Sequence, residues 1–502
     1  MDFLFIGLII VFGVSILITV LSIKINITAM DIVNDMGMGY NLANTFDSYS
    51  DYKEINSPEE QITLWGNKVP TKELFIKIKQ YGFKTIRFPV TWLHFIDEAG
   101  KVNPEWMCRV KEVVDWIIKE KMYCILNIHY DGKKGFWLSK GVAVKDRFKN
   151  LWHEISNEFK NYNKYLIFES MNDIEYDNGD YDYLTLVTLT QAFIDTVRNS
   201  GGKNGDRLLI LSGANKDFDL TCSKDYKMPI DPSNKFAISI HYYLPSPFTI
   251  ENDDDPWEGV TPMTEWGTEN SYKEMFTYFQ TMKEYYIDKG IPIVITETGV
   301  VTEQKKEPKS IRDFLFFEFS LAMSSNGIMA CLFDNSDKEN GGMNFYDREN
   351  DKWFDEGIGE NFKKIYQEKY PKPTDYFILS NRETVTTCIT DGNMKINIGL
   401  KKVKKVIFNV KITAEHTYSV GYGLCTNDKN GKFSGRNVFG ESGTIIQDGT
   451  YTYNIDVSNE DFNSYVEIQK WWGQSNATLN YLTLEYDKKY TIFDFNSYKN
   501  NL

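Results

Sequence analysis

The segment Ile291-Pro292-Ile293-Val294-Ile295-Thr296-Glu297-Thr298-Gly299 is an apolar run of strand length that ends in one carboxylate and a glycine. A strand buried in a parallel sheet has this pattern, because both of its faces are covered. The earlier segment Tyr165-Leu166-Ile167-Phe168-Glu169-Ser170-Met171-Asn172-Asp173 has the same form. Polar groups at the carboxyl ends of parallel strands are typical of (β/α)8 barrels, which place their reactive groups there. These two segments therefore predict a barrel with carboxylates on one rim.

Apolar segments of strand length alternate with helical periodicity over residues 31–370, which predicts a (β/α)8 barrel. A doubly wound open sheet is the alternative. It is disfavoured because polar groups follow nearly every strand and no glycine-rich phosphate loop follows the first one. The predicted strands are Met36–Leu42, Thr85–Val90, Tyr123–Ile128, Tyr165–Met171, Arg207–Ser212, Phe236–His241, Pro292–Thr296 and Gly327–Phe333. The predicted helices are Thr71–Tyr81, Glu105–Glu120, Tyr181–Asn199, Ser271–Asp288 and Ser310–Ser324.

A short proline-containing linker, residues 371–375, ends the barrel pattern. Beyond it, alternating segments separated by Gly, Asn and Asp predict a small all-β sandwich over residues 376–490, followed by a tail of residues 491–502. Adjacent Trp471 and Trp472 should face opposite sides of a strand, one toward the core and one toward solvent. The sandwich resembles a carbohydrate-binding module, and a plain spacer or interaction domain is the alternative.

The amino terminus carries an uncharged, almost wholly apolar run at residues 3–23, long enough to cross a bilayer as a helix. Its amino side has Asp2 and no Lys or Arg, unlike a secretory signal. We therefore expect residues 1–30 to hold an uncleaved membrane anchor, with a cleaved signal as the alternative. Both interpretations predict a protein that is extracellular or at the cell surface.

The amino-acid composition limits the classes of ligand that the protein is expected to bind. The net charge is −14 and no basic cluster occurs, which argues against nucleic acid. The 31 Tyr and 11 Trp suit a protein that stacks rings on sugars, although a large core uses such residues too. The six cysteines form no CxxC pair, so no metal site is predicted. Nothing in the sequence indicates the oligomeric state.

Polar residues collect at the ends of the predicted strands, and three of the five histidines are among them. One such residue alone is usually structural, but many on one rim predict a binding site. Two of them, Asp173 and Glu297, supply the pair of carboxyl groups that glycoside hydrolysis requires. The full set is Asn41, Asn44, Arg87, His94, His129, Asn172, Asp173, His241, Tyr243, Glu297 and Asp334.

Seven segments of the sequence together resemble glycoside hydrolase family 5, in particular its endo-β-1,4-glucanases and xyloglucanases. They occur in the family's order and span about residues 34–370. The matching segments are Met38–Thr45, Trp65–Asn67, Arg87–Trp92, the strand that ends in His129, Phe168–Asn172, His241–Tyr243 and Glu297. The resemblance implies a β-glucan polysaccharide as substrate and no metal or organic cofactor.

The resemblance also implies a role for each site residue. Glu297 would be the nucleophile and Asp173, directly after Asn172, the general acid/base. Arg87 would keep Glu297 ionised and Tyr243 would donate a hydrogen bond to it. Asn172 would hold the sugar 2-hydroxyl. The remaining substrate-binding residues would be Asn44, His94, His129, His241 and Phe333, the last standing where the family has a stacking Trp.

The acid/base position departs from the family, which has Glu where this chain has Asp173. Aspartate is one methylene shorter, which removes about 1.5 Å of reach. General acid catalysis contributes about 10²–10⁴ in rate, so the site is expected to be attenuated. Glu175, two residues on, would point to the same side of an extended chain and could replace Asp173. We therefore predict a retaining β-glycoside hydrolase, with a catalytically impaired glycan-binding protein on the same fold as the alternative.

Overall fold

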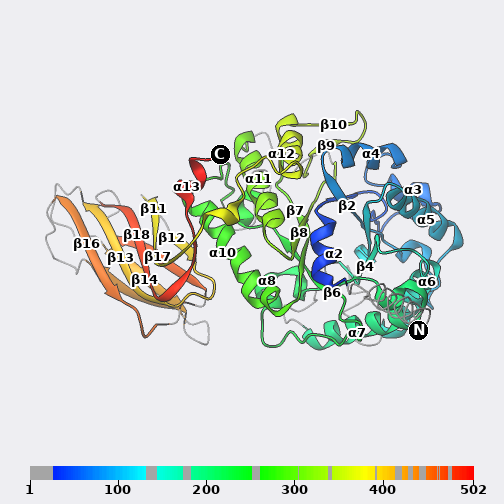
Figure 1. The fold of residues 1–502 in the computed structure, drawn as a ribbon, viewed down its shortest axis with the longest axis horizontal. Helices are drawn as coiled ribbons and strands as arrows, with labels where there is room; N and C mark the ends of the chain where they lie inside the picture. Colours follow the sequence, from blue (N-terminus) through cyan, green and yellow to red (C-terminus); the bar gives the residue numbers. More distant parts are fainter. Residues whose placement is uncertain are drawn as a thin grey trace, which may run out of the picture.

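The computed structural model contains a closed barrel of eight parallel strands followed by two four-stranded antiparallel sheets (Figure 1). This confirms the predicted fold class, a (β/α)8 barrel with a small all-β sandwich. Residues 3–23, the predicted apolar anchor, lie outside the part of the chain that the structure describes. Within that part, no helix combines the length and apolar character needed to span a bilayer. The structure describes residues 27–131, 144–172, 182–250, 261–302, 305–336, 342–389, 393–412, 421–427, 433–439, 448–460, 462, 464–472 and 477–502.

The barrel strands pair in sequence order, and β1 closes the ring by pairing with β8 through Gly39 and Cys331. The strands are β1 Met38–Asn41, β2 Phe83–Phe88, β3 Tyr123–Leu126, β4 Leu166–Glu169, β5 Leu209–Ser212, β6 Phe236–Tyr242, β7 Ile293–Thr298 and β8 Ile328–Leu332. The surrounding helices are α3 Pro58–Ile62, α4 Lys72–Gln80, α5 Pro104–Lys119, α6 Lys145–Glu158, α7 Tyr183–Asn199, α8 Phe218–Thr221, α9 Ser246–Thr249, α10 Glu269–Tyr285, α11 Pro308–Ser324 and α12 Glu356–Tyr366. A short hairpin, β9 Tyr346–Asp347 and β10 Lys352–Trp353, precedes α12.

Local sequence explains why the outer helices form, as α5 illustrates. Asn103 caps its amino end by accepting a hydrogen bond from the Glu105 amide, and Pro104 occupies the first turn. Trp106, Val110 and Ile117 recur at helical spacing and are buried against the barrel.

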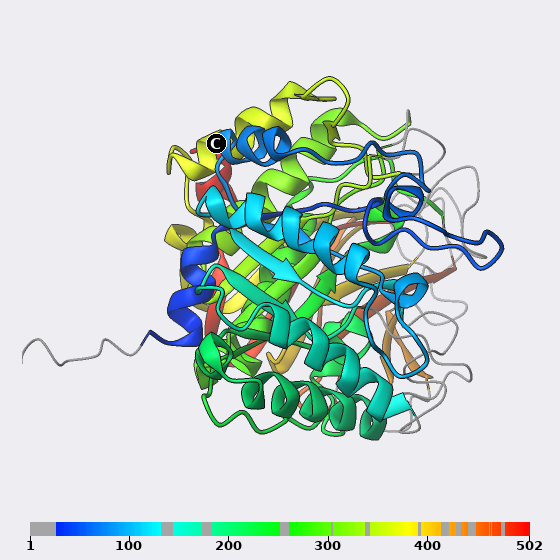
Figure 2. The same cartoon turned by 90° about the vertical axis from the view of Figure 1, so that its right-hand side faces the viewer.

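A helix that the sequence did not predict, α2 Ala29–Met36, closes the amino-terminal end of the barrel. Thr28 and Asp31 form a capping box at its start. Its buried Val33 and Met36 pack on the inward-facing side chains at the start of the strands. Figure 2 shows α2 at one end of the barrel and the long loops after the strands at the other. The first strand was predicted from Met36, but α2 occupies that residue and β1 begins at Met38.

The barrel interior changes character along its axis. Because side chains alternate along a strand, every second residue points inward. On β3 and just beyond it these are Tyr123, Ile125 and Asn127, and on β4 they are Ile167 and Glu169. The inward residues near α2 are thus apolar and those at the carboxyl ends are polar, and all five are buried. The apolar layers stabilise the barrel, while the polar layer is available for chemistry.

The sandwich consists of one sheet in the order β11-β18-β13-β16 and another in the order β12-β17-β14-β15. Its strands are β11 Phe377–Ile389, β12 Asn393–Asn397, β13 Val403–Ile412, β14 Gly421–Asn427, β15 Phe433–Phe439, β16 Gly449–Asp456, β17 Tyr465–Trp472 and β18 Ala477–Phe493. The predicted boundary at residue 490 falls inside β18, and a final helix, α13 Phe495–Lys499, follows it. The side chains of Trp471 and Trp472 lie outside the described ones, so their predicted orientations stay predictions.

Helix α10 joins the two domains. The ring of Phe276 lies 4.7 Å from the ring of Phe377 and 5.7 Å from that of Phe493, measured between centroids. The Lys273 ammonium donates a hydrogen bond of 2.6 Å to the carbonyl of Thr384 on β11. The sandwich therefore packs on the barrel through a continuous apolar contact, as the side-by-side placement in Figure 1 shows.

The closure of the barrel at Gly39 gives a stability prediction. A Cβ at this position would overlap the Sγ of buried Cys331, so Gly39→Ala should lower the free energy of unfolding by about 1–3 kcal/mol. Urea denaturation measures this change. Gly205→Ala is the matched control, because a Cβ added there would meet no atom within 4 Å and its backbone is not left-handed. Equal stability of the two variants would contradict this view of how the barrel closes.

Candidate active site

The guanidinium of Arg87, at the carboxyl end of β2, is fully buried and uses all five of its N–H donors. Nε donates to Oε2 of Glu169 at 2.7 Å, and Nη2 donates to Oε1 of Glu169 at 3.1 Å. Nη1 donates to Oε1 of Glu297 at 2.7 Å and to Oδ1 of Asn41 at 3.0 Å. The second Nη2 proton goes to Oδ1 of Asn172 at 2.7 Å. Arg87 was predicted among the substrate-binding residues, and this geometry makes it the group that orients the others.

Glu169 forms ion pairs with two cations. Besides Arg87, the ammonium of buried Lys216 donates to its Oε1 at 2.6 Å and to Oγ of Ser239 at 2.6 Å. Burial alone would raise the pKa of Glu169, but Arg87 and Lys216 outweigh it and lower the pKa to about 2. Glu169 is therefore a permanent anion, which balances part of the positive charge brought in by the two cations.

A β-bulge aims Glu297 into the site. On β7, Ile295 pairs with Ile240 of β6, yet the next residue on β6, His241, faces Glu297, so Thr296 is an extra residue. The pairing with β8 is irregular at the same place. The Asn41 amide donates to the Thr296 carbonyl at 2.9 Å, which satisfies a carbonyl in the irregular segment. Bulges re-aim side chains in this way, and here the bulge brings the Glu297 carboxylate to Arg87.

Both oxygens of Glu297 have partners. Oε1 accepts from Arg87, and Oε2 accepts from the Tyr243 hydroxyl at 3.2 Å and lies 3.5 Å from Nδ1 of His241. Burial raises the pKa of Glu297, and the ion pair with Arg87 opposes this rise. Burial, together with Lys216 and Arg87, holds the pKa of His241 well below its usual range, so this imidazole is neutral. The predicted hydrogen bond between Tyr243 and Glu297 is present.

Asn172 is oriented by Arg87 and by a histidine. Nδ2 of Asn172 lies 3.5 Å from Nε2 of His129, and Nδ1 of the same ring lies 3.3 Å from Nδ2 of Asn127. Asn127 also donates to Oε2 of Glu169 at 3.2 Å. The buried polar groups at the carboxyl ends of β2, β3 and β4 and just beyond them therefore form one connected network.

The other predicted residues, which are Asn44, His94 and Phe333, make separate contacts. Asn44, at a left-handed φ of 56°, donates its backbone N–H to Oδ2 of Asp47 at 3.0 Å. His94 is half-buried, stacks on Tyr49 with centroids 5.1 Å apart, and accepts from the Ser50 amide at 3.4 Å. Phe333 is half-buried directly after β8 and packs against the barrel core.

Asp173 and Glu175 lie outside the described residues, so their roles stay predictions. In the sequence, Asp173 directly follows Asn172, and Glu175 is three residues after Asn172. Among the residues that the structure describes, no group of three or more His, Cys, Asp and Glu side chains could hold a metal ion.

Sequence reasoning missed two central residues. Glu169 carried a signal, because a carboxylate ends an apolar strand three residues before Asn172. Lys216 carried none, since it lies in an irregular turn where both it and Asn215 have left-handed backbone. Asp334, found at a strand end, is structural: it accepts from the Tyr40 hydroxyl and from the Tyr346 amide, both at 2.9 Å.

Comparison with known proteins identifies similar sequences and structures. The family model described as cellulase (glycosyl hydrolase family 5) matches residues 46–339. Endoglucanase A of Clostridium longisporum is 33% identical over 368 residues, covering 69% of this chain and 68% of that protein. A solved GH5-4 broad specificity endoglucanase from an uncultured bovine rumen ciliate is 56% identical, with a TM-score of 0.66, over 68% of this chain and 98% of that one. A glycoside hydrolase 5 lichenase from Caldicellulosiruptor sp. F32, solved in complex with cellotetraose, is 28% identical with a TM-score of 0.63, over 68% of this chain and 95% of that one.

Loss of Lys216 should destabilise the fold in a pH-dependent way. Lys216→Met breaks a buried ion pair, which we expect to cost about 3–5 kcal/mol at pH 7. A lowered carboxylate pKa stabilises the fold above the unfolded value of 4.5, and this stabilisation is lost as the pH falls toward about 2. The deficit of the variant should therefore be constant above about pH 4.5 and shrink below it.

Urea denaturation between pH 7 and pH 3 measures this deficit. Lys235→Met is the control, because Lys235 is also buried but its partner, Asp206, has a side chain that is 77% exposed. We expect little loss and no such pH dependence in the control. A Lys216→Met deficit that does not change below pH 4.5 would contradict the assigned ion pair.

Proposed function

Because the chain belongs to glycosyl hydrolase family 5 and is a glycoside hydrolase acting on O-glycosyl bonds, we propose that it is a retaining endo-β-1,4-glucanase. The observation that supports this most is the Glu297 carboxylate, which Arg87 holds at one oxygen and Tyr243 at the other. Such a group is positioned before the substrate arrives, and the ion pair with Arg87 favours its charged form. A protein that only bound sugar would have no need for this arrangement.

In the first chemical step, a Glu297 oxygen attacks the anomeric carbon while the bond to the leaving oxygen breaks. Asp173 gives its proton to that leaving oxygen, which departs as a sugar hydroxyl. In the second step, the Asp173 carboxylate takes a proton from water, and the water oxygen displaces Glu297. The anomeric configuration is retained, because two inversions occur. Asn172, whose Oδ1 is held by Arg87, is placed to bond the 2-hydroxyl.

The acid step is expected to be the weak one. Asp173 has a shorter side chain than the glutamate expected at this position, so the proton has farther to travel to the leaving oxygen. The nucleophile and its partners show no comparable change. The enzyme should therefore be slow on substrates with poor leaving groups, which need a full proton transfer, and closer to normal on substrates with good ones.

The proposed substrate is a β-glucan chain such as lichenan, cellulose or xyloglucan. The related lichenase holds cellotetraose, and the other relatives are endoglucanases. The apolar residues 3–23 support an extracellular or surface location, where such polysaccharides are met.

Two substitutions test the two carboxylates. In purified residues 27–502, Glu297→Gln should abolish the release of reducing ends from lichenan, xyloglucan and carboxymethylcellulose, because the amide cannot act as the nucleophile. Asp173→Glu restores the longer arm and should raise the rate, by up to about 10². Glu175→Gln is the control, and it should leave the rate unchanged if Asp173 is the acid.

Three outcomes would contradict the proposal in whole or in part. Hydrolysis that survives Glu297→Gln would remove the nucleophile from its role. A wild type that releases no reducing ends but is retarded in a gel containing the polysaccharide would instead support the glycan-binding alternative, for which the short acid at Asp173 is the motivating observation. Loss of activity in Glu175→Gln would move the acid role to Glu175.

A further inference from the structure

A pocket of about 600 Å³ lies between the barrel and the sandwich. Its barrel wall comes from the loop after β6 and from the first turns of α10, and its sandwich wall comes from β12 and β17. The volume falls within the range of about 300–1,000 Å³ that is typical of small-ligand sites. Neither domain alone encloses this pocket, so it exists because the sandwich docks on the barrel.

The pocket and the catalytic centre share one segment of chain. Tyr243 directs its hydroxyl to Glu297, whereas its neighbours Tyr242 and Leu244 line the pocket. Neighbouring residues of an extended chain face opposite sides, so this short segment separates the two spaces. The pocket and the space around Glu297 therefore lie on opposite sides of the same short segment.

The lining combines apolar and polar side chains from both walls. Leu244 and Met263 are 38% and 37% exposed, which is unusual for large apolar side chains in a concave place. Tyr465 contributes a half-buried ring from β17. Rings and apolar surfaces of this kind match the C–H faces of a pyranose.

Hydrogen-bonding groups line the rest of the pocket. Glu274 on α10 accepts from Asn270 at 2.8 Å, and burial raises its pKa to about 7, so it is partly protonated and can both donate and accept. Glu467 and Lys395 form a pair at 3.9 Å on the sandwich wall. Two carboxyl groups and one ammonium disfavour an anionic ligand, whereas a neutral ligand rich in hydroxyls can bond to all three.

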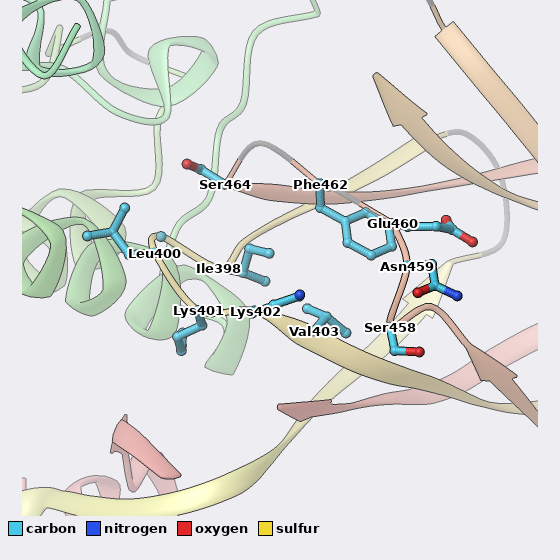
Figure 3. Close-up of a pocket in the computed structure, with 11 residues that line it drawn as sticks. Ile398, Leu400, Lys401, Lys402, Val403, Ser458, Asn459, Glu460, Phe462 and Ser464 are labelled. Carbon is cyan, nitrogen blue, oxygen red and sulfur yellow. The ribbon is translucent and has the colours of Figure 1, made fainter. Parts of the chain in front are cut away.

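A second pocket differs from the first in the side chains that line it. It lies at the end of the sandwich, has a volume of about 670 Å³, and is lined mainly by polar and charged residues (Figure 3). Its single aromatic side chain, Phe462, is buried, and Lys401 is engaged by Glu383 at 3.0 Å. Leu400 is exposed there, but no exposed ring lines this pocket on which a sugar could stack, so we assign it no ligand.

We propose that the pocket between the domains is an accessory binding site for the β-glucan chain, built jointly by the barrel and the sandwich. This inference rests on the proposed function for the identity of the sugar. The site would hold a part of the polymer that lies beyond the sugars flanking Glu297. It would thus help to bind long substrates and contribute nothing to short ones.

Tyr465→Ala tests the proposal in the chain of residues 27–502. Loss of the ring should raise KM for lichenan by about threefold to tenfold, since aromatic contacts contribute on this scale. The value of kcat/KM for an aryl β-cellobioside should stay unchanged. Asn397→Trp, which places a bulky side chain on the sandwich wall of the pocket, should have the same effect. Tyr481→Ala is the matched control, because Tyr481 is an exposed tyrosine on β18 of the other sheet.

Binding is measured separately from catalysis, by retardation of Glu297→Gln proteins in gels that contain lichenan. When Tyr465→Ala is introduced into the Glu297→Gln protein, retardation should weaken. When Tyr481→Ala is introduced into the same protein, retardation should not change. The proposal is overturned if Tyr465→Ala and Asn397→Trp both leave KM and retardation unchanged, or if they impair the short and long substrates equally. If the wild type hydrolyses neither substrate, the proposed function fails, and retardation still decides whether the pocket binds glucan.

Discussion

The site depends on one buried cation. A guanidinium without exposure to water is tolerated only if its charge and all its donors are satisfied, and Arg87 meets this with five bonds to four side chains. Those side chains come from β1, from the ends of β4 and β7, and from the segment after β4. The same group therefore ties strands around the barrel together and sets the position of Glu297. Removing any partner would leave a buried charge partly unpaired.

The need to balance charge around Arg87 explains the second buried cation, Lys216. Arg87 faces two carboxylates, and Lys216 supplies the positive charge that leaves the pair of cations matched by the pair of anions. With Glu169 neutralised mainly by two partners, Glu297 receives only one donor of Arg87. It is held in place and remains less strongly paired than Glu169. This weaker pairing suits a nucleophile, because the carboxylate must loosen its contacts with its partners in order to form a bond to carbon.

Much of the barrel could be predicted from the sequence, because buried parallel strands are near-continuous apolar runs and Glu297 ends one of them. The bulge at Thr296 could not be predicted, because it depends on the register with β6 and β8 rather than on local pattern. Helix α2 was not predicted because it is short and lies in the sequence between the apolar amino terminus and the first strand, so its own pattern does not stand out. Lys216 was missed because its importance arises only when a turn after β5 places it beside Glu169. No local pattern marks Lys216, because its contact with Glu169 joins residues that are far apart in the sequence.

The position of the nucleophile can be tested by covalent labelling with 2-deoxy-2-fluoro-β-cellobiosyl fluoride, which slows the second chemical step, followed by mass spectrometry of peptides. We predict that the label appears on the peptide that contains Glu297. We also predict that it forms much more slowly in Arg87→Lys, because lysine cannot make five directed hydrogen bonds. A label on another carboxylate, or an Arg87→Lys protein labelled at the wild-type rate, would contradict the view that Arg87 positions Glu297 for attack.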